Sequence, residues 1–235
     1  MNVAILLSGG TGTRLGADIP KQYIRVKDRM IITYALSTLV ASSHITDICI
    51  VAATDWQQDI LRDCEETGVE TEKIKWFALP GKTRQDSVFQ GLKAIMEDRK
   101  CSENDCVLVH DAARPLLTAA RIQEYFSAID QHDGVMPALP MKDTIYVSES
   151  GGHISKLLDR EKLFAGQAPE IFRLKKYYEA NEILTEEQMN RVHGSTEPAI
   201  LAGMDIVMTP GDEKNFKITT QEDLERFREI CLKDD

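Results

Sequence analysis

A glycine-rich loop near the start of the chain carries the first residues that could do chemistry. The loop reads Ser8-Gly9-Gly10-Thr11-Gly12-Thr13-Arg14, and Lys21 follows after Pro20. Glycines let a backbone approach a ligand closely and turn several N–H groups toward phosphate oxygens. Two cations beside such a loop suit a triphosphate, because phosphoryl chemistry mainly needs positioning and neutralisation of charge. On spacing alone, an ordinary strand-to-helix turn with a surface arginine and lysine explains the pattern equally well.

Two common nucleotide-binding motifs are excluded by the residues that follow the loop. A P-loop needs Gly-Lys and then Ser or Thr, and the GxGxxG motif needs a glycine at position 15, where Leu15 stands. A nicotinamide-dependent oxidoreductase would also place an acidic residue about 20 positions on, at the end of the second strand. Asp28 and Asp47 are poorly placed for that role. A non-catalytic regulatory or scaffold domain is the plainest alternative to an enzyme.

The loop must be held by a fold, and the hydrophobic pattern predicts an α/β one. Apolar runs typical of strands buried on both faces lie at 3–7, 48–53, 74–79, 107–109 and 206–208. Segments with helical spacing lie between them, one of which has Val88, Leu92 and Ile95 on one face and Gln85 outside it. This alternation predicts a Rossmann-like, mostly parallel sheet with helices on both faces. Functional residues should then gather in the loops that follow the strands.

Residues 142–164 break the alternation. Two strand-like segments there flank Ser150-Gly151-Gly152, whose glycines suit a tight reversal of the chain. We interpret this segment as a β-arm that projects from the core. The chain has 235 residues with 43% hydrophobic content, enough for one substantial core, and no linker divides it. We therefore expect a single domain over residues 1–235.

Charge and residue content exclude several classes of function. The formal net charge of −10 disfavours nonspecific binding of nucleic acid, which needs a basic surface. No apolar run approaches the roughly 20 residues of a membrane span, and the first apolar run lacks the basic flank of a secretory signal. The five cysteines include no CxxC pair, and the five histidines show no metal-ligand spacing. We expect a cytoplasmic protein with reduced thiols and with neither a nucleic acid nor a membrane as partner.

The segment GGTGTRLGADIPKQY at positions 9–23 resembles the signature of the cytidylyltransferases that activate sugar and polyol phosphates. The resemblance is strongest to the 2-C-methyl-D-erythritol 4-phosphate cytidylyltransferase family. Further blocks follow in that family's order: TRQDSV at 83–88, VHDAARP at 109–115, KDT at 142–144, LDR at 158–160 and NFKITTQEDL at 215–224. One short motif could arise by chance, but six in order do not. The chain is therefore expected to be a nucleotidyltransferase.

The resemblance implies a CTP site. The family's glycine loop holds the CTP phosphates, and the matching residues here are Ser8, Gly9, Gly10, Thr11, Gly12 and Thr13. The basic residues that stabilise charge at the α-phosphate correspond to Arg14, Lys21 and Lys217. The residues matching Gly81 and Ser87 lie against the base and ribose. Without the motif, Lys217 would be interpreted as a solvated lysine on a strand.

The resemblance also implies a magnesium site. The aspartate of the HDAARP block, here Asp111, helps to hold Mg²⁺ in the family. It follows the apolar run at 107–109 and so stands at the carboxyl end of a central strand, where catalytic groups collect. The ion would bridge phosphate oxygens and keep several waters, so one or two carboxylates suffice. The alternative role for Asp111 is a helix N-cap, and capping by Thr83 or Asp86 is the alternative for the TRQDSV block.

On the predicted arm, Thr144 and Arg160 match family residues that grip the phosphate of the acceptor substrate. An arginine fork suits phosphate geometry. In the family the arm reaches over a second subunit, so the resemblance implies a homodimer formed through the arm. The implied reaction is attack by a phosphate oxygen of 2-C-methyl-D-erythritol 4-phosphate on the α-phosphorus of CTP, with release of pyrophosphate. The product belongs to non-mevalonate isoprenoid biosynthesis.

Two segments depart from the family pattern, both near the expected acceptor side. The usual Gln-Thr-Pro-Gln appears here as Gln167-Ala168-Pro169-Glu170, which loses a hydroxyl and gains a charge. Near Gly194-Ser195-Thr196-Glu197-Pro198 the family typically has a helix start of the Thr-Asp-Glu/Asp-Ala type, and a proline now occupies it. Pro198 still fits a first helical turn, with Ser195 or Thr196 as its cap.

The alternative acceptor comes from a sister group with the same loop and arm. This group comprises the cytidylyltransferases of ribitol and other pentitol 5-phosphates, which make CDP-polyols for cell-surface polymers. The HDAARP and TRQDSV blocks resemble the methylerythritol branch more closely, since the sister enzymes more often carry HDSVRP. The methylerythritol acceptor is therefore the main interpretation and a pentitol phosphate the alternative.

Overall fold

The structure, a computed structural model, describes residues 1–10 and 19–233. At its centre is a sheet whose described strands follow the order β10-β7-β11-β6-β1-β4-β5, with β12 beside β7. Its parallel part comprises β1 (Asn2–Leu7), β4 (Asp47–Val51), β5 (Ile74–Ala78) and β6 (Cys106–Asp111). The rest comprises β7 (Gly134–Pro140), the parallel β12 (Ile206–Pro210), and the antiparallel β10 (Phe164–Gly166) and β11 (Glu170–Arg173).

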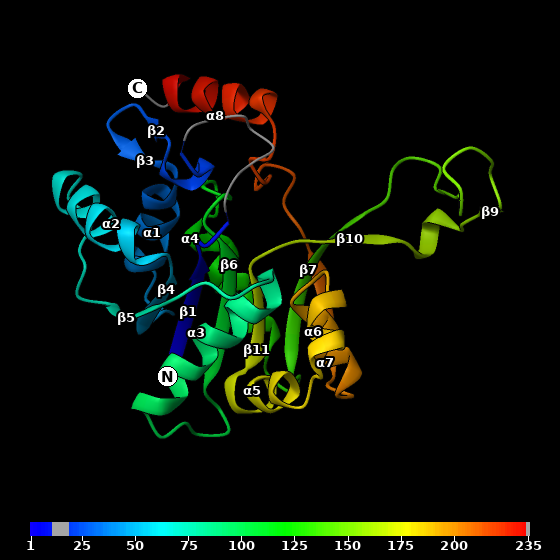
Figure 1. Ribbon diagram of the computed structural model, residues 1–235, viewed down its shortest axis with the longest axis horizontal. Coiled ribbons are helices and arrows are strands. Elements are labelled where there is room, and N and C mark those ends of the chain that lie inside the picture. Colours follow the sequence, from blue (N-terminus) through cyan, green and yellow to red (C-terminus); the bar gives the residue numbers. More distant parts are fainter. Residues whose placement is uncertain (11–18, 234–235) are drawn as a thin grey trace.

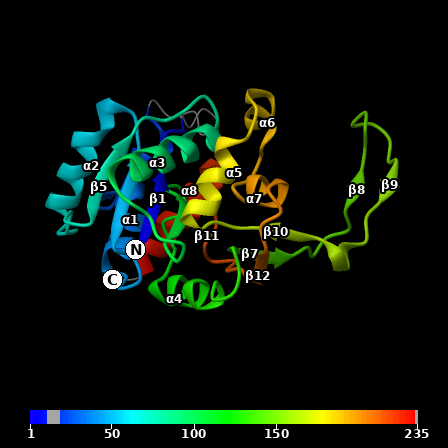
Figure 2. The ribbon, with the colours of Figure 1, turned by 90° about the horizontal axis from the view of Figure 1, so that it is seen from below.

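Helices cover both faces of the sheet, as Figures 1 and 2 show. One face carries α1 (Ile31–Ala41), α2 (Thr54–Glu66) and α4 (Ala119–Ala128). The other carries α3 (Arg84–Asp98), α5 (Leu174–Glu182) and α7 (Thr196–Leu201). The short α6 (Glu186–Arg191) follows α5, and α8 (Gln221–Lys233) packs beyond the strand ends on Val26, Ile31 and Ile218. The predicted Rossmann-like α/β class is confirmed.

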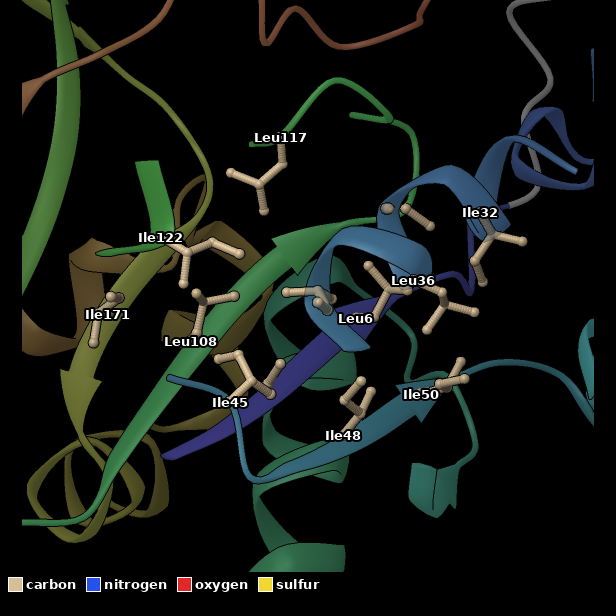
Figure 3. Packing of buried hydrophobic residues seen from close by; sticks show 14 of the residues in the cluster. Leu6, Ile32, Leu36, Ile45, Ile48, Ile50, Leu108, Leu117, Ile122 and Ile171 are labelled. Carbon is tan, nitrogen blue, oxygen red and sulfur yellow. The ribbon is translucent and has the colours of Figure 1, made fainter. Parts of the chain in front are cut away.

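Two apolar cores arise because successive side chains of a strand point to opposite faces. Along β1, Ala4 and Leu6 enter the core below α1 and α4, whereas Val3 and Ile5 enter the core below α3. Figure 3 shows Leu6 of β1 beside Leu36 of α1, and Leu108 of the neighbouring β6 beside Ile122 of α4. Burial on both faces explains the unbroken apolar runs in these strands. The five predicted runs all lie in observed strands, with ends that differ by at most two residues.

The region 142–164 forms the predicted arm. Two short strands, β8 (Tyr146–Val147) and β9 (Lys156–Leu157), pair antiparallel, and the arm extends away from the sheet in both views of the ribbon (Figures 1 and 2). Gly151 has φ +75° in the reversal between the two strands, a conformation that favours glycine. The short helix η3 (Arg160–Lys162) leads from the arm into β10.

Three further expectations from the sequence concern Gln85, membrane spans and the cysteines. Gln85 was expected outside the apolar face of α3, but it is buried, and its amide donates to Asn181 Oδ1 at 2.5 Å and to Tyr177 O–H at 3.2 Å. Among the described residues, no helix is both long and apolar enough to span a membrane. Cys49 and Cys64 are buried, and burial raises the pKa of each thiol to about 12.

Removal of a core side chain tests the two-layer packing. Leu108 on β6 is fully buried, so Leu108→Ala should lower the free energy of unfolding by about 2–5 kcal/mol through lost contacts and a residual cavity. Leu232→Ala is the control, because that side chain is 66% exposed and its loss should change stability by less than about 0.5 kcal/mol. Urea denaturation followed by circular dichroism measures both. Equal effects at the two positions would contradict the packing described here.

Candidate active site

A pocket of about 460 Å³ opens at the carboxyl ends of the parallel strands. In Figure 1 these strands run from the end marked N toward α8, so their carboxyl ends face α8. Segments distant in sequence line it: Leu7, Gly9, Gly10, Lys21, Gln22, Gly81, Lys82, Thr83, Arg84, Ser87, Asp111, Ala113, Lys217 and Thr219. This is the edge of the sheet where α/β folds place their ligands.

The glycine loop forms the first wall. The side-chain amide of Gln22 donates to the carbonyl oxygens of Ser8 at 2.6 Å and of Gly10 at 2.8 Å. Gly9 lies against Pro80 so closely that a Cβ would overlap the proline ring, which explains a glycine at this position. The loop backbone is thus held from two sides while Gly9 and Gly10 face the pocket.

Ser8 differs from the expectation for the loop, because it does not line the pocket. Its hydroxyl donates to the Tyr23 oxygen at 2.9 Å, and its N–H donates to the Val51 carbonyl at 2.8 Å. Both donors of Ser8 therefore serve the fold. The other predicted loop residues, Thr11, Gly12, Thr13 and Arg14, lie outside the described residues.

The start of α3 forms the second wall. Thr83 is the N-cap, and its hydroxyl accepts from the Asp86 N–H at 3.1 Å, which is one of the two capping roles expected for this block. The Ser87 hydroxyl accepts from the Gly81 N–H at 3.0 Å and donates to the Thr83 carbonyl at 2.9 Å. A Cβ on Gly81 would overlap the Asp86 side chain. Gly81 and Ser87 both line the pocket beside a helix N-terminus, a setting that favours anions.

Asp111 lies at the floor of the pocket among three cations. The Arg84 side chain approaches its Oδ1 at 3.1 Å, the Lys217 Nζ approaches Oδ2 at 3.0 Å, and the Arg114 Nε lies 3.7 Å from Oδ2. Burial alone would raise the pKa of this carboxyl, but Arg84, Lys217 and Arg114 hold it well below its usual range. Asp111 is therefore ionised at neutral pH. It is not a helix N-cap, since the next helix begins at Ala119 with Thr118 as its cap.

The two predicted lysines reach the same pocket. Lys21 begins the short helix η2 (Lys21–Tyr23), and Lys217 lies in the segment between β12 and α8. Lys217 lies on no strand and pairs with Asp111, so the alternative interpretation of a solvated lysine on a strand does not hold. Its ion pair with Asp111 spans 106 positions of sequence. Since Lys21 and Lys217 line one cavity with Asp111, the fold brings together cations that the sequence separates.

Arg84 is a pocket residue that sequence reasoning did not single out. It lies inside the TRQDSV block, and a basic residue at the first position of a helix that follows a glycine turn was the available signal. The sequence also did not indicate a role for Gln22, because a glutamine next to a lysine matches no functional motif. Its role becomes visible once the backbone of the loop is placed beside it.

The arm residues lie away from this pocket within one chain. Thr144 and Arg160 are both exposed, and neither lines the cavity. The Arg160 guanidinium donates from Nη1 to the Lys142 carbonyl at 2.8 Å, which links the two chain segments at the base of the arm.

The two segments that depart from the family pattern meet beside Arg84. Glu170 opens β11 and is 7% exposed, and its Oε2 lies 3.9 Å from the Arg84 guanidinium. The Thr196 hydroxyl donates to Glu170 Oε1 at 3.3 Å. Ser195 stands at the N-cap position of α7, but its hydroxyl accepts from Arg84 at 2.6 Å and does not cap the helix. Pro198 occupies the first turn, as expected.

Comparisons with known proteins agree with this geometry. The family model for 2-C-methyl-D-erythritol 4-phosphate cytidylyltransferase (IspD) matches residues 2–233. The chain belongs to this family. A member from Thermotoga neapolitana is 34% identical over 234 residues, which cover 98% of this chain and 97% of the relative. The prediction of a cytidylyltransferase, and so of a nucleotidyltransferase enzyme, is confirmed.

A sister enzyme and a solved structure complete the comparison. The ribitol-5-phosphate cytidylyltransferase of Lacticaseibacillus paracasei is 26% identical and covers 97% of both chains. The crystal structure of 4-diphosphocytidyl-2C-methyl-D-erythritol synthase from Anaerococcus prevotii has a TM-score of 0.80 at 24% identity, over 99% of this chain and 96% of that one. At 24% identity, the structural similarity supports the same fold.

The charge balance at the pocket floor makes a testable prediction. Asp111→Asn leaves Arg84, Lys217 and Arg114 without their main counter-charge, so it should lower the free energy of unfolding by about 3–5 kcal/mol at neutral pH. Because folding lowers the Asp111 pKa, the wild-type advantage should be complete above about pH 4 and shrink as the pH falls further. Denaturant unfolding at several pH values measures this.

A second variant separates charge from packing. Lys217→Met in the Asp111→Asn background removes one of the uncompensated cations, so the double variant should recover part of the lost stability. Strict additivity of the two substitutions would mean that the cations do not depend on Asp111.

Proposed function

We propose that this protein transfers the cytidylyl group of CTP to 2-C-methyl-D-erythritol 4-phosphate and releases pyrophosphate. The observation that carries the proposal is the pocket, in which Gly9, Gly10, Lys21 and Lys217 surround a space large enough for a nucleotide, in a chain of this family. The product is 4-diphosphocytidyl-2-C-methyl-D-erythritol. The protein would then act in non-mevalonate isoprenoid biosynthesis, in the cytoplasm and as a single nucleotidyltransferase domain.

The chemistry needs no protein nucleophile. A phosphate oxygen of the acceptor forms a bond to the α-phosphorus of CTP, and the bond to the bridging oxygen of the β-phosphate breaks, so pyrophosphate leaves with that electron pair. A phosphate monoester is already anionic near neutral pH, so a general base has little to do. The protein contributes mainly cations and backbone N–H groups aimed at the charge that develops on the α-phosphate. We assign this role to Lys21, Lys217 and Arg14.

Asp111 fits a magnesium ion that is shared with the nucleotide. Among the described residues that line the pocket it is the sole carboxylate, and the described chain holds no group of three or more His, Cys, Asp or Glu side chains suited to a metal. Mg²⁺ is usually bound by one or two carboxylates, substrate phosphates and waters, which matches this donor set. Asp111 would hold the ion, which supplies neutralisation of phosphate charge when bound. Ser87 and Gly81 would lie against the base and ribose.

The acceptor site is proposed to form across a homodimer. Thr144 and Arg160 lie outside the pocket of their own chain, and the exposed side chains of the arm include Tyr146, Leu157 and Phe164. Apolar side chains on a projecting element are typical of an interface. Through such a dimer, the arm of one chain would bring Thr144 and Arg160 to the acceptor phosphate at its partner's pocket.

The roles of the lysines can be tested by substitution. Lys21→Ala and Lys217→Ala should each lower kcat for pyrophosphate release about 10²–10³-fold, because a charge contact made in the transition state is worth about 3–4 kcal/mol. Arg14→Ala should behave in the same way. Lys175→Ala is the control, since that lysine pairs with Glu103 on the surface and should leave kcat unchanged. Variants of Lys21 and Lys217 with wild-type kcat would contradict the assigned mechanism.

The acceptor can be tested with the two polyol phosphates side by side. We expect release of pyrophosphate from CTP and Mg²⁺ with 2-C-methyl-D-erythritol 4-phosphate, and kcat/KM at least tenfold lower with ribitol 5-phosphate. The higher identity to the methylerythritol relative, 34% against 26%, supports this order. A coupled pyrophosphate assay measures both. Turnover with ribitol 5-phosphate alone would contradict the acceptor while leaving the cytidylyl transfer intact.

A further inference from the structure

Side chains from three other parts of the fold contact Arg84, which lines the pocket. Its guanidinium lies 3.1 Å from Asp111 Oδ1, and its Nη1 donates to the Ser195 hydroxyl at 2.6 Å. Glu170 approaches the same guanidinium at 3.9 Å, and Thr196 holds Glu170 by a hydrogen bond. Arg84 therefore stands between two carboxylates, and of these only Asp111 lines the pocket.

The hydrogen bonds of Glu170 leave one of its oxygens unused. Oε1 accepts from Thr196, but Oε2 is buried and makes no hydrogen bond in the described structure, and its nearest ion pair is the long one to Arg84. A buried carboxylate oxygen without a hydrogen bond is costly unless a cation compensates it. Burial raises the pKa of the Glu170 carboxyl above its usual value, and the Arg84 cation acts against this rise. Glu170 and Asp111 therefore share the positive charge of Arg84.

The two segments that depart from the family pattern meet in one contact. Glu170 ends the segment Gln167-Ala168-Pro169-Glu170, Thr196 lies in the altered helix start, and the Thr196 hydroxyl donates to Glu170 Oε1 at 3.3 Å.

We propose that Glu170 is a positioning residue, which shares Arg84 with Asp111 and so keeps the Asp111 carboxylate available to Mg²⁺ and the nucleotide. Arg84 forms an ion pair with Asp111 at 3.1 Å. When a metal takes up that carboxylate, Arg84 must give up part of the pair, and Glu170 is the second anion within reach. This inference rests on the proposed metal role of Asp111.

The test measures how CTP binding depends on Mg²⁺. In Glu170→Gln, Asp111 is the one carboxylate left beside Arg84. The Mg²⁺ concentration at which the CTP affinity reaches half of its maximum should therefore rise about tenfold. Loss of a group that supports a metal ligand typically lowers metal affinity by about 10–100-fold. Isothermal titration calorimetry at a series of Mg²⁺ concentrations gives this value without any turnover. An unchanged Mg²⁺ requirement would overturn the proposal.

A rescue and a matched control distinguish positioning from simple stability. Glu170→Gln with Thr196→Asp returns one carboxylate to the pair and should bring the Mg²⁺ requirement back to within about threefold of wild type. Asp63→Asn is the control, because Asp63 is another buried carboxylate paired with an arginine, Arg25, outside the pocket lining. It should lower stability and leave the Mg²⁺ requirement unchanged. A failed rescue, or an equal shift in the control, would overturn the proposal.

Two further outcomes are separable. If Glu170→Gln folds poorly, Ser195→Ala removes another partner of Arg84 and should raise the Mg²⁺ requirement in the same direction, and no rise would overturn the proposal. If wild-type protein binds no CTP at any Mg²⁺ concentration, the proposed function itself fails. If wild type binds CTP with a clear Mg²⁺ requirement and Glu170→Gln matches it, the role of Glu170 alone fails.

Discussion

The site depends on one buried carboxylate, Asp111, and on the cations gathered around it. β6 is buried on both faces up to its end, and Asp111 is the last residue of that strand. A lone carboxylate at that depth would be costly, and Arg84, Lys217 and Arg114 make it tolerable by pairing with it. These partners come from α3, from the segment before α8 and from the turn after β6. Because all three cations pair with the same carboxylate, the segments that carry them are held close to one another around the pocket.

The walls depend in turn on hydrogen bonds that have no direct part in the chemistry. Gln22 donates to two carbonyls of the glycine loop, and Ser87 closes the turn that precedes α3. Each of these contacts fixes the direction of backbone N–H groups at the pocket edge. Arg84 in turn donates to the Ser195 hydroxyl and lies within ion-pair distance of Glu170. The position of the pocket walls therefore depends on residues several contacts away from the pocket.

The fold could be predicted in outline because its parallel strands are buried on both faces, which leaves unbroken apolar runs in the sequence. β7 and β11 carry no such signal. β7 contains Pro137 and Pro140, and β11 has only four residues, bounded by the charged Glu170 and Arg173. β11 is placed by its pairing with β6, and β7 by its pairing with β11. Local pattern cannot report a pairing partner that lies 60 positions away.

By itself, the sequence determined the class of the fold, the glycine loop, the arm and the family, since each is written in local spacing or in contiguous motifs. Tertiary structure alone decided that Ser8 turns into the fold, that Lys217 meets Asp111 from a loop, and that Arg84 and Glu170 belong to one cluster. The physical reason is that hydrogen-bond direction and ion pairing act through space, between side chains whose separation along the chain carries no information about their distance.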